Sequence, residues 1–312
     1  MTLQSEDPDE IAAIHDPTGT VDLSSPRAVE AAIRGLLDGL PGGCADCALL
    51  TRAIDDLVSA YRGDYPGLLR CDTLYHDLRH ALETGVTMAR LLDGASRSAA
   101  DGSVIAVDRE HALLGVILAL YHDIGMLRRD GEEHLWGASL TPIHEERGVE
   151  FLRRYLGDTL LAPLAAKAEL IMPTKLIYQI PADWPALHRQ LAGMIATADL
   201  LSQMSDRFYI EKCRDFLFLE FSAIGLAGSS STAYPDRETL LAKTPGFYTG
   251  FIAKRLDEDF GNVRRFINRH FDGANPYDEA IERNLAYLGN ILANDDYAML
   301  RRHPKVFVPT AA

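Results

Sequence analysis

Two histidines four residues apart open an amphipathic stretch of the chain. They are His76 and His80, in LYHDLRHALETGVTMARLL. Residues with this spacing share one face of a helix, so both imidazoles could serve one site. Histidine binds divalent metals and also exchanges protons near neutral pH. The pair therefore predicts chemistry at this point, provided that further polar groups converge on it.

A histidine–aspartate dyad and an isolated aspartate are the groups expected to converge there. His122 and Asp123 follow the apolar run HALLGVILALY. Adjacent residues of a helix point about 100° apart, so both can reach one point only near a helix end or at a distortion. Gly125 is expected to supply a helix end. Asp199 lies within the apolar stretch MIATADLL, where a carboxylate without a partner is costly. Together with His80, these residues form a suitable ligand set for a hydrolytic divalent metal such as Mn, Fe, Zn or Mg.

Helices are the elements that must bring these residues together. Apolar residues recur three and four positions apart and no stretch alternates with a period of two, which predicts an all-α protein. Ser25 and Pro26 mark the start of a first helix, in SSPRAVEAAIRGLLDGLPGG. Further helices are expected over 47–62, 76–93, 108–122, 144–156, 159–170, 186–204, 207–226, 239–256, 258–270 and 277–296. Irregular segments are expected at 94–107, 125–143, 171–185 and 228–238.

Length, composition and charge limit the classes of function. A chain of 312 residues that is 47% hydrophobic can bury one sizeable core. The net charge of −14 argues against long nucleic acids as partners, although a small anionic substrate is compatible with it if a metal supplies positive charge. No apolar run is long enough to cross a membrane, and the N-terminus lacks the order of a signal peptide. We expect a soluble cytoplasmic protein without a membrane partner, and a homodimer is compatible with the sequence.

The cysteine pattern gives one further candidate site. Cys44 and Cys47 form a single CxxC motif, and the other cysteines are Cys71 and Cys213. A closed zinc site at the motif would need ligands from elsewhere in the chain. Reduced thiols in a loop are the default interpretation, and a metal or redox role for the pair is left open.

Several motifs carry a resemblance to a known superfamily. His80, His122-Asp123 and Asp199 resemble the H…HD…D signature of the HD-domain superfamily of metal-dependent phosphohydrolases. YHDLRHALETGV is similar to the YHNxxHAxxV opening of the class I cyclic-nucleotide phosphodiesterase catalytic domain. MIATADLLSQMSDRFYIEKCRDFLFLEFSAIG is similar to that domain's last-ligand segment, which ends in a Glu-Phe pair, and TPGFYTGFIAKRL to its PxxQxxFI stretch. The resemblance covers roughly residues 58 to 270.

The resemblance implies a domain organisation and a ligand set. A phosphodiesterase-like HD helical bundle would span residues 46–270, after an N-terminal extension with one helix (1–45) and before a C-terminal helix and tail (271–312). One or two divalent ions would bind there. The first metal would be held by His80, His122, Asp123 and Asp199, with Asp123 able to bridge to a second metal.

Two further histidines receive roles from the resemblance. His76 would be the catalytic acid that protonates the leaving oxygen while a metal-activated water attacks phosphorus. Its alternative is a surface position on the helix. TPIHEERGVEFLRRYL resembles the HxxxG helix of HD-GYP proteins, which suggests His144 as a ligand of the second metal. The alternative for His144 is an exposed residue near a helix N-terminus.

The chain departs from these family patterns at three points. HDIGMLRRDG resembles the HDIGK opening of HD-GYP proteins, but Met126 stands where they have lysine and where phosphodiesterases have a water-binding histidine. AELIMPTKLIYQIPADW replaces the His-His and GYP segment. Tyr248 stands where the phosphodiesterases have a purine-reading glutamine, and a tyrosine cannot make the same bidentate contact. The substrate is therefore left open between a 3′,5′-cyclic nucleotide or similar phosphodiester and a nucleoside monophosphate.

Substrate contacts are expected from four residues outside the metal ligands. Tyr248 could stack on a base, Lys175 and Arg128 could steer phosphate, and His134 could line the mouth of the pocket. The alternative for Lys175, Arg128 and His134 is exposure to solvent, because polar side chains in loops mostly face water. The expected partner is a small phosphorylated substrate, a nucleotide in the nearest template.

Two other functions on the same fold stay open. Some HD-fold proteins bind a diiron pair with four histidines and two carboxylates and use oxygen to cleave C–C or C–P bonds. His144 brings this chain to three histidines and two carboxylates. A regulatory or scaffold HD domain is the non-catalytic alternative, and it would retain metal weakly and show no turnover.

Overall fold

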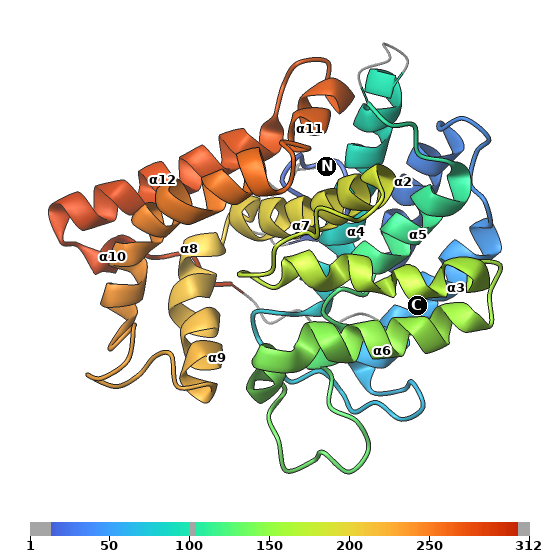
Figure 1. Ribbon diagram of the computed structural model, residues 1–312. Helices are drawn as coiled ribbons and strands as arrows, with labels where there is room; N and C mark the ends of the chain where they lie inside the picture. The colour runs from blue at the N-terminus through green and yellow to red at the C-terminus, as the bar shows by residue number, and fades with distance from the viewer. Residues whose placement is uncertain (1–13, 100–103, 305–312) are drawn as a thin grey trace, which may run out of the picture.

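The computed structural model describes residues 14–99 and 104–304 and is built from helices (Figure 1). No strand occurs in these two ranges, where extended residues pair only as isolated bridges. The all-α prediction is thus confirmed for the described residues. Among them, no helix is both long enough and apolar enough to cross a membrane.

The α-helices follow the predicted order along the chain. Their bounds are α2 (Pro26–Asp38), α3 (Cys47–Arg62), α4 (Leu78–Ala99), α5 (Arg109–Leu120), α6 (His144–Gly157), α7 (Ala186–Ser205), α8 (Tyr209–Lys212), α9 (Phe218–Ala223), α10 (Arg237–Phe247), α11 (Arg265–His270) and α12 (Pro276–Asn294). Segments of 3₁₀ helix lie at Ile124–Met126, Gly137–Ile143, Ala162–Thr174 and Tyr297–Met299. π-Helical turns lie at Cys213–Leu217, Tyr248–Ile252 and Arg255–Asp259.

The structure corrects several predicted boundaries. The α-helix predicted over 159–170 is a 3₁₀ segment, Ala162–Thr174, in which prolines near both ends remove backbone donors. The helix predicted over 207–226 is divided into α8, a π-helical turn and α9. Of the helix predicted over 258–270, only α11 is α-helical. Part of the predicted irregular segment 94–107 belongs to α4, which continues to Ala99.

Helix α4 is buried along most of its length. Every residue from Leu78 to Leu92 is buried, and the helix packs against α2, α5, α7 and α11. A helix that is buried all round belongs to the core. Gly94 permits the contact with α11, because a Cβ atom there would lie 1.8 Å from the carbonyl oxygen of Phe266. The helix that carries His80 is therefore held from several sides.

Charged residues at the start of α4 are buried as pairs. Arg79 Nη1 lies 2.8 Å from Asp206 Oδ2 and 3.2 Å from Glu83 Oε2. Lys212 Nζ lies 2.6 Å from Asp206 Oδ2. Buried charges of opposite sign compensate one another's loss of hydration. The cluster connects α4 to α8 and to the end of α7, the helix that carries Asp199.

The segments that flank residues 46–270 share the same hydrophobic core. Helix α2 contributes Val29 and Ile33, which are fully buried. Helix α12 contributes Ile281 and Leu288 and packs along α7. The helices before and after the predicted domain therefore pack against it directly.

Candidate metal centre

His122 and Asp123 lie directly after the end of α5. The helix ends at Leu120, and Tyr121 (φ −109°, ψ 8°) leads the backbone out of it. The His122 ring is held by a 2.8 Å hydrogen bond from Nδ1 to the carbonyl oxygen of Ala119. Because the backbone turns here, the two adjacent side chains face the same point, with His122 Nε2 3.1 Å from Asp123 Oδ2. The predicted position of the dyad near a helix end is confirmed.

Gly125 does not supply that helix end. Helix α5 has already ended at Leu120, and Gly125 lies in the following 3₁₀ turn. An added Cβ atom at Gly125 would lie 1.9 Å from the carbonyl oxygen of His144 and 2.8 Å from the nitrogen of Gly148. The missing side chain thus lets the turn approach the start of α6, which brings His144 next to the dyad.

We expect Gly125→Ala to lower the free energy of unfolding by about 1–3 kcal/mol, because an extra methyl group forces this backbone contact apart. Metal binding should weaken as well, since His144 moves with α6. Urea unfolding measures the first effect and metal analysis the second. Gly35→Ala in α2 is the matched control, because a Cβ atom there meets nothing within 4 Å. Unchanged stability in Gly125→Ala would contradict the packing role.

The prediction that His76 and His80 share one face of a helix is wrong, because only His80 lies in α4. The Asp77 carboxylate accepts a 2.9 Å hydrogen bond from the backbone N–H of His80. This cap makes α4 begin at Leu78, so His76 precedes the helix. The two imidazole rings nevertheless lie close together, with their centroids 6.5 Å apart.

The four residues predicted to hold the first metal meet in one buried cluster. Ligand atoms of His80, His122 and Asp123 lie within 4.8 Å of one another. His80 Nε2 is 3.1 Å from Asp199 Oδ1 and 3.6 Å from Asp123 Oδ2. His122 Nε2 is 3.3 Å from His80 Nε2 and 3.5 Å from Asp199 Oδ1. None of the four residues is more than 6% exposed.

The donors and acceptors of this cluster call for a cation. Donation from Nδ1 to the Ala119 carbonyl leaves the lone pair of a neutral His122 on Nε2, facing the carboxylates. Asp123 Oδ2 is buried and accepts no hydrogen bond, because His122 Nε2 lies outside hydrogen-bonding geometry. Acceptors that face one another are stabilised by a metal ion or by protons on the imidazoles. The buried His80–His122–Asp123 group could therefore hold a metal ion.

The electrostatics of the cluster agree with this interpretation. Burial raises the pKa of Asp123, but the imidazoles of His122 and His144 more than offset it and hold that pKa well below its usual range. Burial lowers the pKa of His122, whereas the carboxylates of Asp123 and Asp199 raise it well above its ordinary value. Protons and a metal ion would thus compete for the same acceptors.

Asp199 reaches the cluster from within α7. Its Oδ1 atom accepts a hydrogen bond from Gln203 Nε2, one turn further along the helix. Gln203 Oε1 in turn accepts a 3.3 Å hydrogen bond from the Tyr75 hydroxyl. No role was predicted for Gln203, although its spacing of four residues from Asp199 was an available signal.

His144 lies against the second oxygen of Asp123. Its Nε2 atom is 3.4 Å from Asp123 Oδ1, and its Nδ1 atom is 2.7 Å from the carbonyl oxygen of Thr141. Asp123 therefore faces His80 and His122 with one oxygen and His144 with the other, as a bridging carboxylate does in a two-metal site. Glu145 adds a further buried acceptor beside His144, since it is 3% exposed and its Oε2 atom accepts no hydrogen bond.

His76 pairs with Glu220, a residue for which no role was predicted. His76 Nδ1 lies 2.6 Å from Glu220 Oε2. Glu220 Oε1 accepts hydrogen bonds from the backbone N–H groups of Leu74 (2.9 Å) and Tyr75 (2.7 Å). The His76 side chain is 15% exposed, more than that of His144 at 10% or of the four buried ligands. His76 thus stands at the edge of the cluster, with its ring centroid 6.3 Å from that of His144.

The two predicted phosphate-steering residues are engaged with protein groups. Lys175 Nζ lies 2.7 Å from Glu146 Oε1 and 3.6 Å from Glu145 Oε2, at the start of α6. Arg128 Nη2 lies 3.1 Å from Asp72 Oδ2, and Arg128 Nη1 donates to the carbonyl oxygen of Leu135. Arg128 thus braces the loop that follows the dyad.

The other two predicted substrate residues are not brought to the cluster. His134 is exposed on the loop between Met126 and Gly137. The Tyr248 side chain is half-buried and interacts with Arg264, near Asp278 of α12. Among the described residues, neither makes a hydrogen bond or ring contact with a predicted metal ligand.

Cys44 and Cys47 lie close to Asp38, at the junction of α2 and α3. Ligand atoms of the three residues lie within 4.8 Å of one another, and Cys47 Sγ is 3.9 Å from Asp38 Oδ1. Burial and the neighbouring Cys47 raise the pKa of Cys44 to about 12. These three residues could hold a metal ion, so a metal or redox role for the cysteine pair stays open.

Comparison with known proteins identifies a family. Neither a curated protein nor a solved structure matches the chain. Residues 66–265 match the family described as Npun_R2479-like, and this segment contains every predicted metal ligand as well as His76 and Glu220. Because the match covers more than half of the 312 residues, the chain belongs to the Npun_R2479-like family.

Proposed function

We propose that the chain is a metal-dependent phosphohydrolase of the HD type that hydrolyses a phosphodiester, such as a 3′,5′-cyclic nucleotide. The observation that carries the proposal is the buried cluster of His80, His122, Asp123 and Asp199, with the His76–Glu220 pair at its edge. Imidazole and carboxylate ligands suit the divalent metals that phosphoester hydrolysis uses. An ionisable pair beside such a cluster supports catalysis rather than a scaffold role.

The cluster residues could serve one or two divalent ions. His80, His122, Asp123 and Asp199 would hold the first ion, and His144 together with Asp123 would hold a second. A bound divalent ion would supply Lewis acidity at the phosphoryl group and activate a water molecule. Asp199 is held for this role by Gln203, and His122 by the carbonyl of Ala119. These outer contacts orient the ligands before any ion arrives.

His76 is the group that would move a proton in the reaction. Glu220 accepts from His76 Nδ1, so the protonated ring presents its Nε2–H to a departing oxygen. Glu220 would act as a positioning residue, because one oxygen accepts from His76 and the other accepts from two backbone N–H groups. The same carboxylate favours the charged imidazole that a general acid requires.

A metal-supplemented substrate screen tests the proposed function. The full chain is loaded with Mn²⁺, Zn²⁺, Fe²⁺ or Mg²⁺ and assayed against cyclic nucleotides, dinucleotides and mononucleotides. We expect metal-dependent turnover of a diester and faster hydrolysis of bis-p-nitrophenyl phosphate than of p-nitrophenyl phosphate. The reverse order would assign monoesterase chemistry. Metal retention without any phosphoester turnover, or oxygen uptake by the iron-loaded protein, would overturn the proposal.

A further inference from the structure

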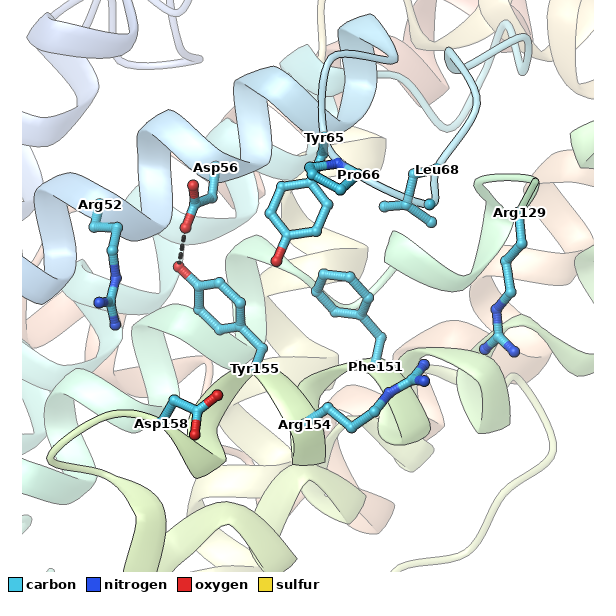
Figure 2. A pocket seen from close by; sticks show the side chains of 11 residues that line it. Arg52, Asp56, Tyr65, Pro66, Leu68, Arg129, Phe151, Arg154, Tyr155 and Asp158 are labelled. Atoms are coloured by element: carbon cyan, nitrogen blue, oxygen red, sulfur yellow. Dashed lines mark hydrogen bonds between the residues drawn. The ribbon is translucent and has the colours of Figure 1, made fainter.

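A cavity of about 530 Å³ lies between α3, the loop 63–68 and α6 (Figure 2). None of the residues that line it is a predicted ligand of the metal centre. Its volume is in the range of sites that hold small molecules. Tyr121 separates the two sites, because its ring packs against the cavity residues Phe151 and Tyr155 and it directly precedes His122.

Aromatic rings form the middle of the cavity wall. Phe151 and Tyr155, one turn apart on α6, stack with their centroids 6.0 Å apart and their planes at 13°. Tyr65 faces them from the loop after α3, with its centroid 5.8 Å from that of Phe151. All three residues are half-buried, so part of each side chain is accessible to a ligand. Such surfaces bind planar ring systems by stacking.

Positive charge gathers at one end of these rings. Arg129 and Arg154 lie on the Phe151 side of the cavity in Figure 2. Both pair with the same carboxylate, because Arg129 Nη2 is 2.6 Å and Arg154 Nη2 is 3.6 Å from an oxygen of Glu150. The Glu150 side chain is 53% exposed, so these pairs are weak. Two guanidinium groups that share one carboxylate keep an excess of positive charge, on a chain whose net charge is −14.

Carboxylates lie at the other end of the rings. Asp56 and Asp158 stand on the Tyr155 side, together with Arg52 (Figure 2). Asp56 Oδ2 accepts a 2.9 Å hydrogen bond from the Tyr155 hydroxyl, which fixes the carboxylate against the ring. Carboxylate oxygens accept from N–H groups. The cavity thus offers cations at one end, ring faces in the middle and hydrogen-bond acceptors at the other end.

We propose that this cavity binds a nucleoside monophosphate as a second ligand, separate from the metal centre. The phosphate would pair with Arg129 and Arg154, for which guanidinium groups have the right geometry. The base would pack against the accessible side of the Tyr65–Phe151 ring pair, and its N–H edge would donate to Asp56 or Asp158.

Calorimetric titration of the full chain with AMP and with GMP tests the proposal. We expect saturable binding, and an affinity about tenfold or more lower in the Arg129→Gln/Arg154→Gln double variant, which loses both charged donors. Arg153→Gln is the matched control, because Arg153 lies on the same helix but approaches Glu169 at 3.8 Å instead of lining the cavity. Circular dichroism verifies that each variant is folded.

The metal centre itself could bind a nucleotide, so the titration is repeated with Asp123→Asn. We expect binding at the cavity to survive this substitution. Loss of binding in Asp123→Asn with full binding in the double arginine variant would place the nucleotide at the metal centre and overturn the proposal. Absence of saturable binding to the wild-type chain would overturn it as well. An equal loss of affinity in Arg153→Gln and in the double arginine variant would also overturn the proposal. Such a result would show that nucleotide binding depends on the total charge of the chain and not on a defined site.

Discussion

Asparagine in place of Asp123 is expected to abolish tight metal binding and to reduce phosphoester turnover roughly a thousandfold or more, since metal ligation supplies several kcal/mol of transition-state stabilisation. Asp123 faces His80 and His122 with one oxygen and His144 with the other. An amide carries no charge, and its NH₂ group would donate to an imidazole lone pair instead of leaving that lone pair to a metal. The substitution therefore removes the central anion at nearly constant volume.

Metal analysis and thermal unfolding measure this effect without an assay of activity. A metal present at about a thousand times its dissociation constant stabilises the folded state by about 4 kcal/mol, which raises the melting temperature. We expect that rise in the wild-type chain and none in Asp123→Asn. Asp130→Asn is the control, because Asp130 is exposed on the following loop and its loss should leave the metal-dependent rise intact. Equal metal content in both variants would show that Asp123 is not a ligand.

The helical fold was predictable because its signal is local. Helix α3 spans the residues predicted from apolar spacing, and α6 and α7 each extend one residue beyond the prediction. Errors arise where a distant residue decides the outcome. The helix predicted over 76–93 was expected to end before Gly94, yet α4 continues to Ala99, and the backbone of Phe266 in α11 occupies the space that a side chain at Gly94 would fill. Such tertiary contacts override local preference.

The site residues also differ in how far the local sequence indicates them. A charged residue in an apolar helix needs a partner wherever it lies, so His122, Asp123 and Asp199 could be selected before their partners were known. Glu220 meets the same criterion, because it stands in the apolar stretch FLFLEFSAIG, and this was an available signal. What the sequence does not show is its partner, His76, which is 144 residues away.

Arg128, predicted to steer phosphate, shows the opposite error, in which a charge that looks free in the sequence has a partner in the fold. The sequence displays the charge of Arg128 but not the Asp72 carboxylate that the folded chain brings to it. The cavity beside α6 was missed for a related reason. The spacing of Phe151 and Tyr155 is typical of a buried helix face. In the structure, however, both residues are only half-buried.

Alanine in place of His76 is expected to leave metal binding intact and to slow hydrolysis of a cyclic nucleotide about 10²–10⁴-fold, the contribution of a positioned general acid. The loss should depend on the leaving group. An alkoxide must be protonated as it departs, whereas 4-nitrophenolate leaves readily without a proton. We therefore expect a much smaller loss with bis-p-nitrophenyl phosphate. His188→Ala is the control, since His188 lies beside His111 and away from the cluster. Equal losses with both substrates would contradict the role of His76 as the acid.

The positioning role of Glu220 has a separate signature in the pH profile. Burial by itself lowers the pKa of His76, but the carboxylates of Glu220 and Asp123 raise it to about 9. A raised pKa keeps His76 protonated at neutral pH, so activity is lost only as the pH rises through that value. A metal ion bound to Asp123 would neutralise the effect of the Asp123 carboxylate on the pKa of His76. Glu220 would then be the main group that favours the charged ring.

Glu220→Gln should therefore move the alkaline limb of the kcat profile toward neutral pH, while metal content stays unchanged. Glutamine has a single acceptor oxygen, so it keeps either the hydrogen bond from His76 Nδ1 or those from the backbone N–H groups of Leu74 and Tyr75. In both orientations the negative charge beside the ring is lost, which lowers the pKa of His76. A role in packing alone would lower the rate at every pH and leave the limb where it is. Two results together would identify His76 as the titrating acid. The alkaline limb would be displaced in Glu220→Gln, and the limb that His76 causes would be absent in His76→Ala.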